Sequence, residues 1–300
     1  MKFLKKLVEE KNESSVPPIE AETSMISIMR KNLGGYRTPR GYSTIHASEI
    51  TKDDFCPRRV ALVDTLDLKL SGEFLPAALK ATFDVGEATA KLVVEEWLGD
   101  KAIGNWVCLA CGTRVHLSKK PGYKYCDSHP SKVCRWSYEE VSFKSAVNGV
   151  TGSLDVLVDL GGSHLFVAEL KIMAPDAFEK LVAPLMEHRV RTNLYMKIVS
   201  DSLSPFRCKI NQLEARVLYV SRGHGKKNLE QKGEILPFKE FVVTRDESVL
   251  VPLMKKADAV HRFRTKGVMP KGICSTSFEK TAKGCVACSA CFSGKFPVGV

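Results

Sequence analysis

The sequence predicts an α/β domain with a mixed β-sheet flanked by helices and a small cysteine-rich insertion. Strand-like segments between 138 and 173 alternate with short glycine or polar turns, and two later segments have apolar residues at helical spacing. Residues 106–136 are poor in aliphatic side chains and rich in Lys, Gly, Pro and Cys. This change of composition predicts a module inserted into the domain.

The segment before the insertion divides into a leader and the start of a domain. Residues 1–45 are polar and turn-rich, so we expect a flexible leader with one helical candidate at 21–33. The domain is expected to span residues 46–300. It should open with a capped turn and helix in 47–66, followed by a helix from residue 81 that ends at Gly99.

The segment after the insertion contains the predicted sheet. The expected elements, in order, are strands at 138–147, 151–160 and 164–173, a helix at 176–200 perturbed at Pro184, strands at 214–222 and 239–245, and a helix at 247–263. No internal repeat is apparent.

The charge of the chain does not select a function by itself. The formal net charge is +11, and the basic residues are distributed along the sequence. Such a surface suits a polyanion such as nucleic acid, and it equally suits a solvated basic protein.

Composition also bears on the compartment. No run of 18 apolar residues occurs, and the N-terminal MKFLKKLVEEKN places acidic residues directly after a short apolar patch, unlike a secretion signal. Ten cysteines in an unsecreted chain of this size favour metal or cluster ligation over disulfides. We therefore expect the reducing cytoplasm of a cell.

Three charged residues interrupt the apolar stretch GSLDVLVDLGGSHLFVAELKIM, residues 152–173. Glu169 and Lys171 are two apart on one strand, so they point to the same face. If Gly161, Gly162 and Ser163 form a three-residue hairpin loop, Asp155 falls opposite Glu169. The pattern predicts a patch of two carboxylates and a lysine.

Two adjacent carboxylates favour a hard cation, Mg²⁺ or Mn²⁺, which can polarise a phosphodiester and activate water. Lys171 would orient that water or stabilise charge on the phosphate. The alternative is an amphipathic hairpin whose three charges face solvent. The apolar neighbours in LFVAEL favour the metal site.

A local set of five potential metal ligands lies in or near the insertion: Cys108, Cys111, Cys126, His129 and Cys134. A Cys-x2-Cys knuckle followed by Cys-x2-His is typical of tetrahedral zinc, and Cys134 could replace His129 as fourth ligand. The segment has almost no aliphatic core, so zinc would supply most of its folding free energy. We predict a structural, zinc-ribbon-like insertion.

A second set of cysteines is split across the chain: Cys56, Cys274, Cys285, Cys288 and Cys291. Their separation allows a staple between the two ends of the domain, a second zinc site, or free buried thiols. Cys208 stands alone and is predicted to be a small buried apolar residue. The histidines at 46, 188, 224 and 261 have no partner at ligand spacing and are predicted to be ordinary, although His188 lies one turn before Arg191 on the helix expected to flank the charged patch.

GSLDVLVDL followed by VAELK resembles the active-site hairpin of the PD-(D/E)XK nuclease superfamily, in particular its RecB-like iron–sulfur branch with CRISPR-associated and phage exonucleases. The resemblance assigns the superfamily's aspartate, glutamate and lysine to Asp155, Glu169 and Lys171. CPRR and the C-terminal cysteines resemble the branch's cluster motifs, which implies a [4Fe–4S] cluster on four of the five split cysteines. Cys56, Cys285 and then Cys291 fit best, and Cys274 and Cys288 stay open as the fourth ligand.

The sequence departs from this family at two positions. The family's upstream metal-binding histidine aligns with Ala90, so Glu87 or Glu95 would have to substitute, or water would complete the metal. The family's Gln and Tyr, four apart on the helix after the lysine strand, correspond to Arg191 and Tyr195.

The resemblance implies a metal-dependent DNA nuclease, most simply an exonuclease on single-stranded ends in replication, repair, recombination or DNA processing. Tyr195 and Arg191 would position the strand, and basic residues at Arg222, Lys226 and Lys227 could follow its backbone. Two alternatives are a catalytically weak DNA-end-binding adaptor and a structure-specific endonuclease. Protein partners in a DNA-processing complex are compatible with each.

Overall fold

The computed structural model describes residues 25–33, 35–37, 40–70, 72–122, 134–223 and 236–293. The chain divides into two compact units, one drawing its described residues from Met1–Pro39 and Ser71–Asp84 and the other from Arg40–Leu70 and Val85–Val300. In the smaller unit β1 (Gly35–Arg37) pairs antiparallel with β2 (Glu73–Leu75), a pair that the sequence did not predict. Helix α2 (Met25–Leu33) lies within the helical candidate of the expected leader.

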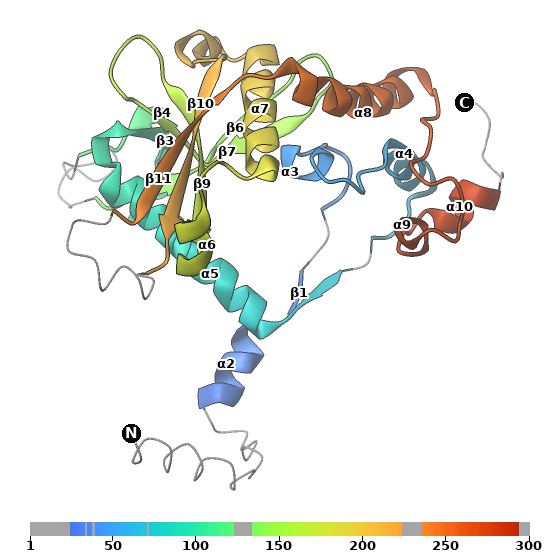
Figure 1. Cartoon of the computed structure of the whole chain (residues 1–300), viewed down its shortest axis with the longest axis horizontal. Helices are drawn as coiled ribbons and strands as arrows, with labels where there is room; N and C mark the ends of the chain where they lie inside the picture. Colours follow the sequence, from blue (N-terminus) through green and yellow to red (C-terminus); the bar gives the residue numbers. More distant parts are fainter. Residues whose placement is uncertain are drawn as a thin grey trace, which may run out of the picture. The chain divides into compact units, whose positions relative to one another are not determined.

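A seven-stranded mixed sheet is the centre of the larger unit (Figure 1). Its order is β11-β10-β9-β8-β3-β4, with β5 also paired to β3; only the β9 and β10 neighbours are parallel. The bounds are β3 (Ala102–Cys108), β4 (Arg114–Lys119), β5 (Trp136–Glu139), β8 (Val156–Val158), β9 (Phe166–Met173), β10 (Glu214–Ser221) and β11 (Phe238–Thr244). A separate hairpin joins β6 (Val141–Lys144) to β7 (Thr151–Leu154). The mixed α/β architecture predicted from the sequence is confirmed.

The helical elements that the sheet-bearing region contributes follow the predicted order with finer divisions. They are α3 (Ala47–Ile50), α4 (Pro57–Leu66), α5 (Ala77–Leu92), η2 (Val93–Trp97), η3 (Gly99–Lys101), α6 (Pro175–Lys180), α7 (Met186–Asp201), η4 (Pro205–Lys209), α8 (Glu247–Lys266), α9 (Lys280–Lys283) and α10 (Cys288–Ser293). The helix expected over 176–200 is two helices. The break spans Pro184, which has no backbone N–H to donate and which disfavours helical geometry in the residue before it.

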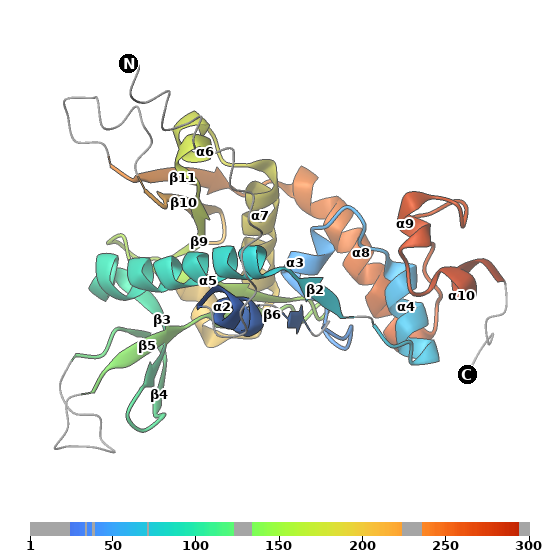
Figure 2. The ribbon, with the colours of Figure 1, turned by 90° about the horizontal axis from the view of Figure 1, so that it is seen from below.

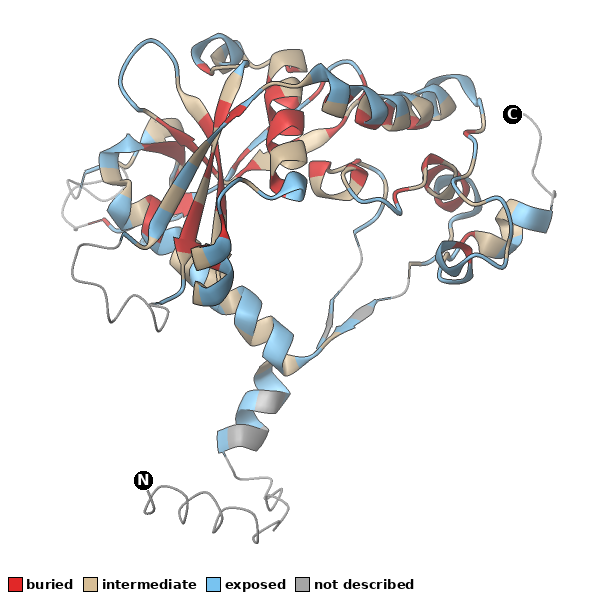
Figure 3. Ribbon diagram, in the orientation of Figure 1, coloured by how far each residue is buried: buried red, intermediate tan, exposed pale blue. Residues whose placement is uncertain are grey.

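Buried residues lie on both faces of the sheet (Figure 3). On one face Val167 packs in a core with Leu194 and Ile198 of α7. On the other face Ala168 packs in a core with Val93 of η2. Since side chains alternate along β9, Glu169 and Lys171 are in phase with Val167 and face α7.

The segment expected as an inserted module is continuous with this sheet in its described parts. Strand β3 contains Trp106, which is fully buried, and Cys108 pairs in register with Trp136 of β5. Trp106 and Tyr138 pack edge to face with ring centroids 5.3 Å apart. Aromatic packing therefore replaces the aliphatic core that the composition lacks.

The β8–β9 hairpin has the predicted register with a longer loop. Val156 pairs with Ala168 and Val158 with Phe166, so the connection covers residues 159–165 instead of three residues. Gly161 and Gly162 adopt positive φ angles of 84° and 106° within it. Asp155, one position before Val156, is the next register position and lies opposite Glu169.

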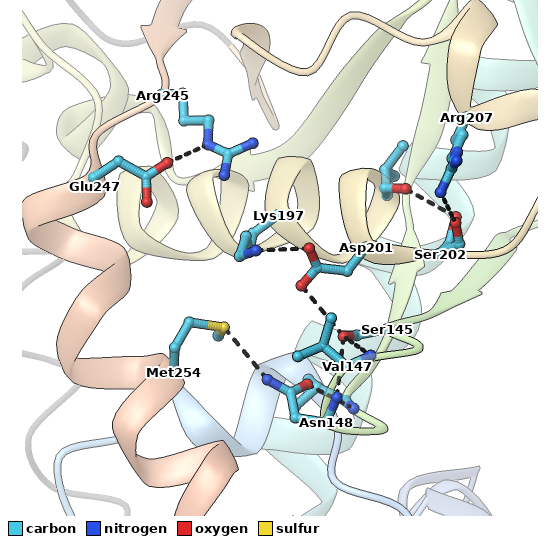
Figure 4. Close-up of polar contacts among 12 residues, drawn as sticks. Ser145, Val147, Asn148, Lys197, Asp201, Ser202, Arg207, Arg245, Glu247 and Met254 are labelled. Atoms are coloured by element: carbon cyan, nitrogen blue, oxygen red, sulfur yellow. Dashed lines mark hydrogen bonds and ion pairs between the residues drawn. The ribbon is translucent and has the colours of Figure 1, made fainter.

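Polar contacts join the C-terminal end of α7 to its neighbours (Figure 4). Lys197 Nζ donates to Asp201 Oδ1 at 2.6 Å, and Ser145 Oγ donates to Asp201 Oδ2 at 3.3 Å. Asn148, in the turn between β6 and β7, donates through Nδ2 to Met254 Sδ of α8 at 3.6 Å. These contacts attach the β6–β7 turn to both α7 and α8.

Among the described residues, no helix combines the length and the apolar character that crossing a membrane requires.

Gly152 permits the close approach of β7 and α7. A Cβ added at Gly152 would lie 2.9 Å from Tyr195 Cδ1, closer than real Cβ contacts allow. We expect Gly152→Ala to lower the free energy of unfolding by about 1–3 kcal/mol in urea titration, because Tyr195 must shift. Gly86→Ala is the matched control: it meets no atom within 4 Å in α5, so it should raise stability by about 0.5–1 kcal/mol. Equal effects of the two substitutions would contradict this packing.

Candidate active site

The structure brings Asp155, Glu169 and Lys171 together. Lys171 Nζ lies 2.6 Å from Glu169 Oε1 and 3.4 Å from Asp155 Oδ2. The backbone N–H of Leu170 donates to Asp155 Oδ2 at 2.7 Å. Strand β9 thus fixes Asp155 through its main chain while presenting Glu169 and Lys171 on the same face.

Glu169 is the most buried member of the group, with no exposed surface. Arg191 Nη1 of α7 donates to Glu169 Oε1 at 3.2 Å, on the same oxygen that Lys171 contacts. The second oxygen, Oε2, is buried without a hydrogen-bond partner among the described residues. An unpaired buried carboxylate oxygen costs free energy, so Oε2 is the atom of this group at which a proton or a cation would be stabilising.

Burial and the nearby charges shift the protonation of this group. Burial, followed by the charge of Asp155, raises the pKa of Glu169 to about 7, although Lys171 and Arg191 oppose the shift. Burial alone would lower the pKa of Lys171, but Asp155 and Glu169 raise it above its ordinary value. Lys171 is therefore a cation at neutral pH, where Glu169 is close to its titration midpoint.

One face of α7 covers the group with side chains one turn apart. His188, Arg191 and Tyr195 recur at spacings of three and four residues. Burial, followed by the charges of Glu169 and Asp155, raises the pKa of Tyr195, so its hydroxyl stays protonated. Arg191 contacts Glu169 directly, which extends the predicted role of Arg191 to the carboxylate itself.

His188 was predicted to be ordinary, but the structure places it beside the group. It is 7% exposed, and Nδ1 lies 2.8 Å from the Tyr219 hydroxyl, which also accepts from the backbone N–H of Leu185. Burial, then the charges of Lys171 and Arg191, lowers the pKa of His188 to about 4. In the neutral tautomer with its proton on Nε2, His188 accepts a hydrogen bond at Nδ1 from the Tyr219 hydroxyl, a contact that joins α7 to β10. The spacing of His188 and Arg191 on one helix was the available signal.

Glu140 is a further carboxylate that the sequence did not single out. Partial burial, followed by the charge of Asp155, raises its pKa, and Glu87 raises it further. Glu87 thus acts electrostatically on Glu140.

Glu95 makes hydrogen bonds to other residues, since its Oε1 accepts from Tyr138 N at 2.7 Å and from Ser137 Oγ at 3.1 Å. A metal role for Glu95 is therefore not supported.

The two carboxylates fit a hard divalent ion. The charge of Asp155 raises the pKa of Glu169, and Oε2 of Glu169 has no partner among the described residues. No group of three or more His, Cys, Asp or Glu side chains is gathered closely enough to enclose an ion within the described ranges. Mg²⁺ commonly uses one or two carboxylates and completes its shell with water and phosphate oxygens, which suits this pair.

The five split cysteines surround one pocket at the other end of the larger unit: Cys56, Cys274, Cys285, Cys288 and Cys291. Cys56 is the N-cap of α4, where its Sγ accepts from Arg59 N at 3.4 Å. Burial raises the pKa of Cys285, and the charges of Cys56 and Cys288 raise it further. Residues more than two hundred positions apart in the sequence therefore share one site.

The insertion's ligand set is described only in part. Cys126 and His129 lie outside the described residues. Cys108 and Cys134 are buried in the same core, and the Gly112 N–H donates to the Cys108 carbonyl at 2.8 Å, which closes a tight turn that also contains Cys111. Together with the described residues they form no three-ligand group.

The remaining sequence predictions have mixed outcomes. Cys208 is exposed, and its Sγ lies 3.2 Å from the Pro205 carbonyl, so the prediction of a buried apolar residue is wrong. Its position in the short η4 turn holds it at the surface. Arg222 is exposed at the end of β10, while Lys226 and Lys227 lie outside the described residues.

Comparison with known proteins finds distant structural likenesses. No protein-family model matches the chain, and no curated protein matches it. The crystal structure of SSO0001 is 13% identical with a TM-score of 0.34, covering 86% of this chain and 90% of that one. The alkaline exonuclease LHK-Exo from Laribacter hongkongensis is 10% identical with a TM-score of 0.37, covering 72% and 85%. The structure of LHK-Exo in complex with dAMP is 11% identical with a TM-score of 0.36, covering 72% of this chain and 85% of that one.

Metal binding to this pair should depend on pH. With a folded pKa of about 7 for Glu169 and an unfolded value of about 4.3, the metal-free protein loses stability as pH rises through that window. A metal ion needs the ionised carboxylate, so we expect the increase in Tm caused by Mn²⁺ to grow between pH 6 and pH 8.

Glu169→Gln should abolish most of that Mn²⁺-dependent increase at both pH values. Glu214→Gln makes the same chemical change on β10 and is the matched control, because it should retain the wild-type response. A Tm increase independent of pH in the wild type, or unchanged by Glu169→Gln, would argue against metal binding here.

Proposed function

We propose that this protein is a metal-dependent nuclease that hydrolyses phosphodiester bonds in DNA. The supporting observation is the buried Glu169, whose Oε2 has no partner in the described structure and lies in a group with Asp155 and Lys171. In a strongly basic chain, this combination suits a cation and a phosphate together. The finer proposal, a PD-(D/E)XK exonuclease on single-stranded ends, is supported by the sequence resemblance.

Each side chain has a distinct role in this proposal. Asp155 and Glu169 would hold Mg²⁺ or Mn²⁺, which supplies Lewis acidity toward the phosphate and its attacking water. Lys171, a cation in contact with both carboxylates, would donate to that water or to the phosphate oxygen on which charge develops. Arg191 and the protonated Tyr195 would position the strand.

A second candidate function is a DNA-end-binding adaptor with weak catalysis. Arg191 stands where the family has a glutamine, and it already pairs with Glu169 together with Lys171. Two cations on Glu169 partly neutralise the carboxylate that a metal would use. Ala90 in place of a histidine removes a further ligand.

Cleavage of end-labelled DNA decides between these candidates. We expect the wild type, purified without oxygen, to shorten single-stranded DNA progressively with Mg²⁺ or Mn²⁺. Lys171→Ala should lower the rate about 10²- to 10³-fold, because a donor to the developing charge is lost. Lys180→Ala, an exposed lysine on α6, is the control and should cut like the wild type. If all three proteins bind DNA and none cuts, the adaptor candidate is favoured.

We propose that the cysteine pocket holds a [4Fe–4S] cluster. A four-iron cluster takes one thiolate per iron, so its ligands surround a volume, whereas a zinc ion draws four ligands to a point. Five cysteines from both ends of the domain line one pocket, which is the observation that supports this proposal, and the sequence resemblance favours the cluster over a second zinc. Its role would be to join α4 to the C-terminal segment.

We also propose a structural zinc ion on Cys108, Cys111, Cys126 and either His129 or Cys134. The tight turn at Cys108 supports this proposal.

Metal analysis of variants tests both sites at once. Cys285→Ser should remove iron and retain zinc, while Cys108→Ser should remove zinc and retain iron. Cys208→Ser changes an exposed thiol and should alter neither metal. Zinc in place of iron at the Cys285 site, or retention of iron in Cys285→Ser, would contradict the cluster proposal.

A further inference from the structure

A groove lined by positively charged side chains lies in the larger unit, on α8 and the segment that follows it. The groove is open and has a volume of about 440 Å³. Helix α8 supplies Lys255, Lys256 and Arg262 to its lining, and the following segment supplies Lys271 from another side. Helix α4 lies beside α8 (Figure 2) and contributes Pro57 to the lining of the groove.

Among the described residues, no acidic side chain lines the groove beside its four cations, although Asp258 lies one turn from Lys255 and from Arg262 on α8. None of the four cations forms an ion pair within the described ranges. Lys256 contacts only a backbone carbonyl, that of Lys52, at 3.4 Å. Arg264, also on α8, differs: it pairs with Asp64 at 2.9 Å. The groove lining therefore carries four positive charges that have no ion-pair partner among the described residues.

The spacing of these cations suits an extended polyanion. Lys255, Ala259 and Arg262 are at positions i, i+4 and i+7, so they lie on one face of α8. Seven residues of helix cover about 10 Å, a length that corresponds to about three nucleotides of one strand. The small side chain of Ala259 lines the groove between Lys255 and Arg262, and Lys271 lines the same groove.

The remaining lining limits what the groove can recognise. It contains apolar residues such as Val268, Met269 and Ile273, and no aromatic side chain on which a base could stack. Its lysines offer no base-specific pattern. The groove can therefore contact phosphates without distinguishing the sequence.

The groove also adjoins the cysteine pocket. Ile273 lines both, and Pro57 and Cys56 are consecutive. A Cβ at Gly272 would lie 3.8 Å from Cys291 Sγ. The wall that carries Lys271 is thus held by the segment that supplies the cysteines.

We propose that this groove is a phosphate-backbone-binding site for DNA, separate from the carboxylate group. The proposal rests on the proposed function in so far as the polyanion is DNA. The groove holds a part of the strand away from the bond that is cut, and it contributes affinity without contributing to the reaction.

Fluorescence anisotropy with labelled single-stranded and duplex oligonucleotides, at several KCl concentrations, tests this proposal. Full-length protein carrying Glu169→Gln serves as the background, so that the DNA stays intact. Adding Lys255→Ala and Lys271→Ala, one from each wall, should weaken binding about tenfold. The slope of log K against log salt should fall in magnitude by about 1.4 for single strands, because two phosphate contacts are lost.

The matched control carries Lys69→Ala and Lys144→Ala, two exposed lysines outside the groove with the same loss of charge. It should change affinity less than twofold. Equal effects of the two double variants, or no DNA binding in the background protein, would overturn the groove proposal. Groove-dependent binding by a wild type that never cuts would support the groove and reject the nuclease. If the wild type cuts DNA but the double groove variant binds DNA with full affinity, the nuclease is supported and the groove proposal is rejected.

Discussion

The candidate site depends on one buried carboxylate that is only half satisfied. Glu169 has no exposed surface; Lys171 and Arg191 both contact Oε1, and Oε2 has no partner in the described structure. A buried charge is tolerated when it is paired, so the two cations make ionisation of Glu169 possible. Burial and the charge of Asp155 raise the pKa of Glu169, so that a proton competes at this carboxylate with the metal ion that we propose.

Much of the surrounding fold serves to keep this arrangement in place. The β8–β9 register sets Asp155 opposite Glu169, and the Leu170 N–H holds the Asp155 carboxylate. Gly152 lets the Tyr195 ring approach β7, so that α7 can bring Arg191 to Glu169. The Tyr219–His188 contact supports the same face of α7 from the neighbouring strand β10. Removing Lys171 or Arg191 would therefore change both the charge and the packing of Glu169.

The cations on Glu169 also set the balance between the two functions considered. Lys171 contacts both carboxylates, and it stays charged because they raise its pKa. Arg191 adds a second positive charge that a metal ion has to tolerate. A nuclease needs a metal ion to bind Glu169 in spite of the positive charges of Lys171 and Arg191, whereas an adaptor needs no metal ion there.

The sequence predicted the parts of the site that periodicity controls. Alternation along the strands placed Glu169 and Lys171 on one face, and the register of Asp155 followed even though the loop is longer than expected. Side chains from distant elements were less accessible. Glu140 acts on Asp155 across the end of the β6–β7 hairpin, where Val141 pairs with Leu154, and the sequence did not predict the pairing of those two strands. Lys271 joins the α8 cations through the segment that follows Gly267, where φ is 67°. Such encounters depend on tertiary packing, which local spacing does not encode.

Anomalous scattering from crystals soaked in Mn²⁺ tests directly whether Asp155 and Glu169 bind a metal ion. We expect a peak between Asp155 and Glu169, in direct contact with Glu169 Oε2. Absence of a peak at saturating Mn²⁺ and at a pH well above 7, with Lys171 and Arg191 still in contact with Glu169, would contradict this expectation.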